Sequence, residues 1–395
     1  MHAIPLKQSR RSQQRLLTAA AIAAALAAGQ AGAVEIVSGD WTVDVGGIVN
    51  AYATTVSCSG DAVGGPALAG RGLGCSGESS KTSIGNGLLP SGLITKFKTS
   101  QDGRDIGGTI GIMVHAATDS GIAANSAVDV RQAFFTIGTA EAGTLKIGRD
   151  YGVFGANAIL SDMTLLGAGA PVQATQRGRV TLGHIGAGYT YLGTYGQMTY
   201  TSPVLGGGFT FTGALVSPVD SGLYASQAGP QYQAQLAWAG NGFKAWIGAK
   251  MQHFADAGAG TGGFAETAGE IGVSYANGPF GFLANYQEGK GIGILTDGDQ
   301  GPVKGRNYLV QGTYKVTDKL KFGLNYGESR NKDDNATNVA LNGSFKSNTN
   351  VTAGLYYGLT KSITLAGEIG DTRSKDYLGN TAKMFGGSLG GIIFF

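Results

Sequence analysis

Residues 130–154 read VRQAFFTIGTAEAGTLKIGRDYGVF and decide the fold. Two short segments with β-strand composition, 131–138 and 144–150, flank a tight polar turn at 140–143. The second segment does not turn back. It opens into a connection at 151–194 that carries few charges yet includes Asp162, and a connection this long in a compact β protein is usually functional. If the two strands belong to a wide closed barrel, we expect this loop to lie inside it and narrow the opening.

The first 33 residues are predicted to be a secretory signal peptide. Residues 1–15 carry four basic and no acidic residues, 16–28 form an apolar run, and Ala31, Gly32 and Ala33 make a small-residue cleavage site. The apolar run is too short for a membrane helix, which needs roughly 20 residues. We therefore expect an exported protein whose folded domain spans 34–395.

Charge and composition narrow the class of protein. Removing the predicted signal leaves 25 basic and 26 acidic residues, so the basic excess disappears and nucleic acid is not an expected partner. Glycine accounts for 69 residues without a Gly-X-Y period, which excludes collagen. An exported, glycine-rich chain with alternating polarity can still cross a membrane as a β-barrel, because only every second residue of each strand faces lipid.

Alternation of period two runs through the mature chain. In 320–327, Leu320, Phe322, Leu324 and Tyr326 alternate with lysine, glycine and asparagine. The same pattern, read along the chain, predicts an all-β fold with sixteen strands. Their ranges are 40–54, 89–98, 106–117, 130–138, 144–150, 195–201, 209–217, 232–239, 243–253, 266–276, 280–287, 307–315, 319–327, 348–358, 363–371 and 383–395.

The connections between these segments alternate strictly in length. Seven are short and contain the Gly, Asn, Asp and Pro that tight turns require, while eight are long. The long ones are 55–88, 118–129, 151–194, 218–231, 254–265, 288–306, 328–347 and 372–382. This alternation is typical of an antiparallel transmembrane β-barrel with turns at one rim and loops at the other. Aromatic residues near the strand ends are typical of interfacial girdles.

At four places the chain resembles the general diffusion porins of Gram-negative outer membranes. They are Arg131 to Phe134, the GRDYGV of 148–153, the SDM of 161–163, and the terminal Phe395. The resemblance covers the whole mature chain in layout. It implies a trimeric sixteen-stranded barrel in the outer membrane, with a third loop folded inward, and it implies an assembly role for Phe395.

The resemblance also implies a set of pore-constriction residues. Asp162 is the acid of the inward loop, and Arg131 and Arg179 are bases of the opposite wall. Arg149 matches an arginine that either lines the constriction or braces the loop, and Lys96 lies on the strand that supplies a further base, although the aligned position is nearer Ile94. The chain departs from well-known relatives at Leu166, where they carry a second carboxylate.

Opposed charges across a narrow water-filled gap maintain a transverse field that discriminates between ions. A channel in which one acid faces two or more arginines is expected to prefer anions. Each of these residues also has a simpler interpretation: the arginines as solvated residues of the barrel interior, and Asp162 as a loop carboxylate that caps a turn.

Other chemistry is less well supported. Cys58 and Cys75 are expected to form a disulfide that closes a surface loop; two free thiols or a metal pair are the alternatives. His115, His184 and His253 have no metal-ligand spacing, and no GxSxG or SxxK element accompanies the serines. We therefore predict a passive channel for ions and small hydrophilic solutes, with no cofactor and no catalysis, embedded in outer-membrane lipid as a homotrimer. A substrate-selective channel and, further off, a membrane-barrel hydrolase are the alternatives.

Overall fold

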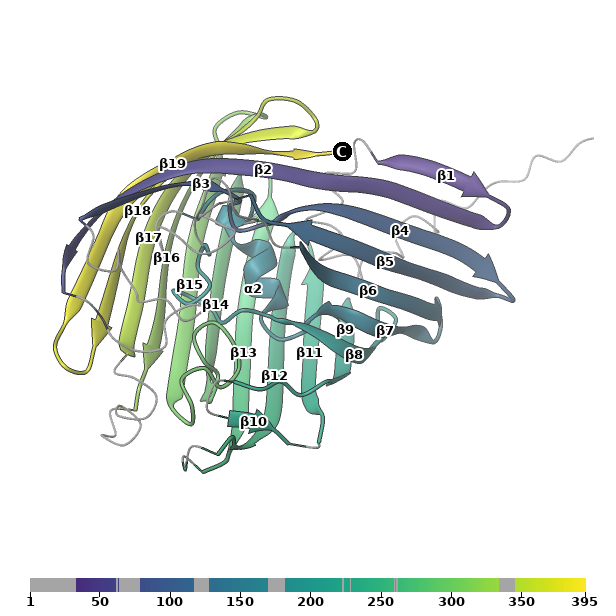
Figure 1. Cartoon of the computed structure of the whole chain (residues 1–395). Helices are drawn as coiled ribbons and strands as arrows, with labels where there is room; N and C mark the ends of the chain where they lie inside the picture. Colours follow the sequence, from purple (N-terminus) through teal and green to yellow (C-terminus); the bar gives the residue numbers. More distant parts are fainter. Residues whose placement is uncertain are drawn as a thin grey trace, which may run out of the picture.

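A computed structural model describes residues 33–61, 63, 79–116, 128–169, 182–221, 224–227, 229–258, 260, 262–333 and 345–395. In this part of the chain nineteen strands form one antiparallel sheet, and sixteen of them make the closed barrel drawn in Figure 1. Each barrel strand pairs with the next, and the last pairs with the first over Ala382–Gly60 to Phe394–Ile48. The barrel strands are β2 (Trp41–Gly60), β4 (Ser91–Gln101), β5 (Arg104–Val114), β6 (Val128–Thr139), β7 (Gly143–Tyr151), β8 (Thr194–Thr201), β9 (Phe209–Val216), β11 (Gln231–Gly240), β12 (Phe243–Asp256), β13 (Phe264–Asn277), β14 (Phe280–Lys290), β15 (Lys304–Lys315), β16 (Leu320–Asn331), β17 (Phe345–Gly358), β18 (Ile363–Asp376) and β19 (Thr381–Phe394).

All sixteen predicted strand ranges overlap observed barrel strands, so the predicted fold class is confirmed. The three remaining strands were not predicted. They are short and attach to barrel strands: β1 (Val34–Ser38) and β3 (Ser80–Gly85) pair with β2, and β10 (Tyr224–Ser226) pairs with β12.

The two faces of the barrel wall differ as alternation requires. On β16, Leu324 is 49% exposed on the outward face, while Asn325 on the inward face is 2% exposed. On β12, the outward Ile247 is exposed and the inward Trp246 is buried. Each strand therefore presents an apolar row outside and a largely polar row inside.

Tight turns close the hairpins at one rim. Asp102 and Gly103 both have positive φ, as do Asn241 and Gly242. Two consecutive positive φ values match the turn whose twist suits a two-residue hairpin, and Asn-Gly or Asp-Gly is its preferred sequence. The turn at 100–105 and the turn at 240–242 are thus explained by their residues.

No helix in the described part of the chain has the length and apolar character needed to cross a membrane. The helical elements among these residues are short: α2 (Ala156–Ser161) and the 3-10 helix η2 (Met163–Leu166) both lie in the long connection after β7.

Candidate functional site

The long connection after β7, described over 152–169 and 182–193, is bonded to the inward face of the wall. Because its backbone is irregular, its buried N–H groups need acceptors outside regular secondary structure. Wall side chains supply these acceptors: Gln233 accepts from Val153 N at 2.7 Å, Gln311 from Met163 N at 2.7 Å and Glu368 from Gly169 N at 2.6 Å. Further acceptors are Glu270 for Gly155 N, Gln287 for Thr190 N and Ser329 for Gly188 N.

These acceptors lie on β11, β13, β14, β15, β16 and β18, and α2 itself lies against β13 (Figure 1). Two positions beyond β18 in the sheet order, the Tyr52 hydroxyl on β2 donates to Leu166 O at 2.6 Å. The connection therefore contacts strands spread around much of the circumference.

Asp162 sits inside this connection, and its side chain has no exposed surface. It caps η2 by accepting from Thr164 N at 2.9 Å, and it accepts from the Tyr189 hydroxyl at 2.6 Å. The distance between His184 Nδ1 and Asp162 Oδ2 is 3.7 Å. Burial raises the pKa of the Asp162 carboxyl, but His184, Tyr189 and Thr164 together hold that pKa below its ordinary value. These contacts match a loop carboxylate that caps a turn; the constriction role stays a prediction.

Arg131 is placed by a β-bulge. Gly111 pairs with Gln132 and Ile112 with Val130, so Arg131 is the extra residue of β6 and its side chain is re-aimed. Its Nε lies 2.9 Å from Asp129 Oδ2, and its guanidinium donates to the Tyr191 hydroxyl at 3.5 Å. In the described part of the chain its ion-pair partner is thus Asp129, not Asp162. Its effect on permeating ions remains a prediction.

The other predicted bases of the constriction are Arg149, Arg179 and Lys96. Arg149 is 44% exposed at its side chain and bonds Val130 O at 2.9 Å and Thr194 Oγ1 at 3.1 Å, which is a bracing position between neighbouring strands. Arg179 lies outside the described residues. Lys96 on β4 points inward and lines a cavity.

This cavity, called the vestibule below, has a volume of about 310 Å³ and lies between residues 151–160 and the rim of short turns. Three lysines line it: Lys96 on β4, Lys146 on β7 and Lys244 on β12. Lys146 forms an ion pair with Asp150, and Lys244 donates to Asn157 Oδ1. Threonines of β5 to β9 supply hydroxyl groups, among them Thr109, Thr136, Thr144, Thr199 and Thr210. Period-two alternation along each strand cannot show that lysines of three different strands share one cavity.

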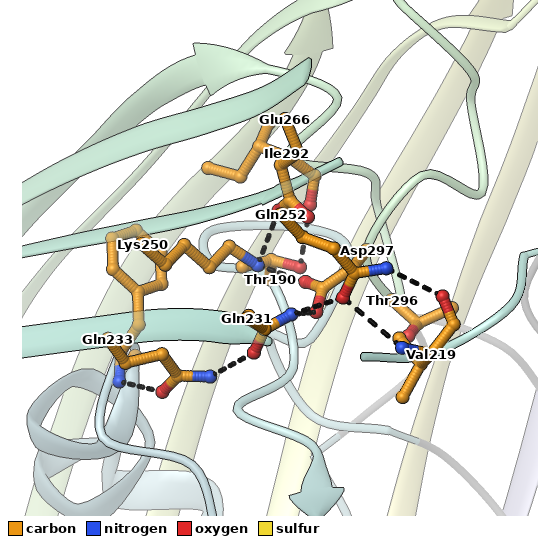
Figure 2. A network of polar contacts seen from close by, with 12 residues as sticks. Thr190, Val219, Gln231, Gln233, Lys250, Gln252, Glu266, Ile292, Thr296 and Asp297 are labelled. Atoms are coloured by element: carbon orange, nitrogen blue, oxygen red, sulfur yellow. Dashed lines mark hydrogen bonds and ion pairs between the residues drawn. The ribbon is translucent and has the colours of Figure 1, made fainter. Parts of the chain in front are cut away.

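A second connection, 291–303 between β14 and β15, was predicted only as a long loop. Asp297 of this connection contacts Lys250 on β12 and accepts from Gln231 Nε2 at 2.7 Å and Tyr195 OH at 3.0 Å. Figure 2 shows Lys250 between Asp297 and Glu266. Although Lys250 lies on the inward face of β12, it is not exposed to water: it is 4% exposed and ion-paired.

The remaining candidates from the sequence are the two cysteines, possible metal ligands and Phe395. Cys58 on β2 is disulfide-bonded, and its expected partner Cys75 lies outside the described residues. Among the described residues no group of His, Cys, Asp and Glu could hold a metal ion. The backbone of Phe395 pairs with Gly47 of β2, with N–O distances of 3.1 and 2.7 Å.

Comparison with known proteins agrees with the barrel. A family model described as Gram-negative porin matches residues 17–377. The outer membrane channel DcaP of Acinetobacter baumannii is similar in structure (TM-score 0.66, 16% identity, 90% of this chain and 97% of that chain). The anion-selective porin from Comamonas acidovorans is also similar (TM-score 0.63, 17% identity, 90% of this chain and 100% of that chain). Salmonella typhi OmpF, solved in complex with daunomycin, is similar as well (TM-score 0.62, 18% identity, 92% of this chain and 100% of that chain). A search of curated proteins gave no significant match.

Proposed function

The chain belongs to the Gram-negative porin family, and from this premise we propose that its channel is narrowed by residues 152–169 and 182–193 and prefers small hydrophilic anions. Family and fold make the protein an outer-membrane diffusion channel and not an enzyme. Flux through such a channel follows the concentration gradient.

The hydrogen bonds of residues 152–169 and 182–193 support the proposed narrowing. The segment bonds inward side chains from β11 round to β2, an arc of more than half the barrel strands, which supports a position inside the barrel. Those bonds use buried, charge-assisted or amide acceptors such as Glu270, Glu368 and Gln311. Such bonds contribute about 0.5–3 kcal/mol each, so several of them hold the segment firmly. In this arrangement the space left beside the segment sets the size limit for solutes.

The anion preference rests on one observation about the vestibule: three lysines line it, whereas Asp150 is the one acid among its lining residues. Elsewhere on the inward side, Glu270 and Glu368 of the wall accept hydrogen bonds from the first connection, and Asp297 of the second connection accepts from Gln231 of the wall; each of the three acids is 5% exposed or less. Lys96, Lys146 and Lys244 line the vestibule. A channel lined with more positive than negative charge raises the local concentration of anions and lowers that of cations.

The similarity to porins supports an oligomeric channel, and we propose a homotrimer. The channel would contact outer-membrane lipid through the exposed apolar rows of the wall.

Reconstitution of the purified protein into a planar bilayer with a KCl gradient tests the function. We expect discrete current steps. We also expect a reversal potential whose sign shows that chloride permeates more readily than potassium. Absence of current steps would overturn the channel assignment, and a reversal potential of the opposite sign would overturn the anion preference alone. Exclusion of neutral sugars of increasing size in a liposome-swelling assay then measures the size limit.

A further inference from the structure

We infer that the connection 291–303 between β14 and β15 forms a second narrowing of the channel, and that Asp297 is the residue that positions it. The inference rests on the proposed function, because a narrowing matters only where solutes diffuse through the barrel. It goes further, because the proposed narrowing is made by residues 152–169 and 182–193, whereas this one is made by a separate connection.

The connection 291–303 is buried, unlike most loops. Loops of folded proteins usually run over the surface. None of the residues 291–303 is exposed, and the side chain of Asp297 has no exposed surface. The side chains of Ile292 and Ile294 are 1% and 4% exposed. Such burial requires other parts of the chain on several sides, so the connection folds into the barrel and does not project from its rim.

Asp297 fixes this connection to the inward face of the wall. Its carboxylate contacts the ammonium of Lys250 on β12 and accepts from Gln231 Nε2 on β11 at 2.7 Å (Figure 2). The Tyr195 hydroxyl on β8 donates to the same carboxylate at 3.0 Å. Charge-assisted hydrogen bonds of this kind are roughly twice as strong as neutral ones. A carboxylate with partners on three strands therefore holds the connection against the wall.

Asp299, the other acid of the connection, has different partners. It accepts from the backbone N–H groups of Ile294, Leu295 and Thr296, at 2.8, 2.8 and 3.1 Å, all within the same connection. Asp299 therefore shapes the connection itself, whereas Asp297 attaches it to the wall. For this reason the positioning role belongs to Asp297.

The contacts of the connection extend from β8 to β16. Asn331 Nδ2 on β16 donates to Gln300 Oε1 at 3.3 Å. The strands from β8 to β16 are eight neighbours among the sixteen of the barrel, so these contacts cover half of the wall. The Thr190 hydroxyl of the first connection also donates to Ile292 O at 3.2 Å. An inward connection of this extent reduces the width left for solutes, and pore width is a determinant of selectivity.

The two connections bond β11 at different depths. Gln231, which bonds Asp297, is the first residue of β11 at the rim of long connections. Gln233, which accepts from Val153 N of the first connection, lies two residues further from that rim. A solute that enters from this rim therefore meets the connection 291–303 before it meets the segment that begins at Val153, and the two narrowings act in series.

The test measures liposome swelling with neutral sugars, using the full-length protein and three variants. Asp297→Ala should release the connection, and deletion of residues 293–301 should remove it. Both changes should raise the rate of swelling in raffinose relative to that in arabinose, because the larger sugar gains most from a wider path. The matched control is Asp220→Ala, since Asp220 is an exposed acid of another long connection and accepts from Ser226 N and its hydroxyl. Its swelling ratio should equal that of the unmodified channel.

An unchanged swelling ratio in the deletion variant would overturn the second narrowing. A raised ratio in the deletion variant but not in Asp297→Ala would overturn the positioning role of Asp297, and so would a lower melting temperature of Asp297→Ala at an unchanged ratio. A rise in Asp220→Ala as large as that in Asp297→Ala would overturn the assignment to this connection. Heat-modifiable migration on gels verifies that each variant has folded. Absence of KCl current steps from the unmodified protein would instead contradict the proposed function.

Discussion

Lys250 on β12 lies 3.0 Å from Glu266 on β13, and the same ammonium contacts Asp297 of the 291–303 connection. The exposed fraction of all three side chains is 2% or less. Asp297 also accepts from Gln231 on β11 (Figure 2). It accepts from Tyr195 on β8 as well, so one buried carboxylate ties this connection to β8, β11 and β12. Lys250 lies 5.1 Å from the ring centroid of Phe154, and Thr190 donates to Ile292 O at 3.2 Å. The two connections on the inward face are therefore held together.

Replacing Lys250 by methionine should destabilise the barrel by about 3–5 kcal/mol, because two buried carboxylates lose their cation. The temperature at which the folded, fast-migrating form disappears on a gel measures this loss. Lys304→Met is the control, since Lys304 is an exposed lysine at the start of β15. If Lys250→Met and Lys304→Met melt together, the ionic cluster does not stabilise the fold.

Gly327→Ala should displace the stretch 184–188 from the wall. A Cβ at Gly327 would lie 2.0 Å from the carbonyl oxygen of Ala187, a backbone atom that has to move. The expected cost is about 1–3 kcal/mol, and the expected result is a changed single-channel conductance with more current noise. Gly312→Ala on the neighbouring strand is the control, because nothing lies within 4 Å of its Cβ position. Identical conductance in the two variants would show that this stretch does not shape the channel.

Acid should loosen the first connection through Asp162. The pKa of its carboxyl is below the ordinary value of about 4. A depressed pKa in the folded state contributes stability above the unfolded-state pKa, and this stability is lost as pH falls through the folded-state value. We expect current noise to increase below about pH 4 in the unmodified channel. Asp162→Asn should show similar noise already at pH 7.

The comparison between the two proteins isolates Asp162 from other acids, including Asp297, whose pKa is also below its ordinary value because Lys250, Gln231 and Tyr195 outweigh its burial. Asp162→Asn also tests the predicted constriction role. A shift of the reversal potential toward anions would support that role, while added noise at an unchanged reversal potential would support turn capping alone.

The sequence predicts features that depend on neighbouring residues better than features that depend on residues far apart along the chain. Period-two alternation is local, so the strands and the inward direction of Lys244 and Lys250 could be read from it. Whether an inward lysine meets water or protein depends on where a distant connection folds. Asp297 lies 47 positions from Lys250 along the chain, and no periodicity links them. The bulge that re-aims Arg131 depends on the register with β5, which is a tertiary property as well.

Phe395 closes the seam between the last and first barrel strands. Its N–H donates to Gly47 O at 3.1 Å and its carbonyl accepts from Gly47 N at 2.7 Å. Its ring also covers Gly47, where a Cβ would lie 2.6 Å from the ring carbon Cζ. Deleting Phe395 removes both backbone bonds, about 1 kcal/mol each, together with the ring, whereas Phe395→Ala removes only the ring.

We expect the deletion to reduce the yield of heat-modifiable barrel in outer membranes more than Phe395→Ala does, because only the deletion leaves Gly47 unpaired at the seam. Equal losses would show that the ring is what matters, as a recognition signal during assembly would require. Full yield from the deletion variant would contradict both roles. In vitro refolding into detergent separates them further, since a missing seam bond slows refolding there and a missing recognition signal does not.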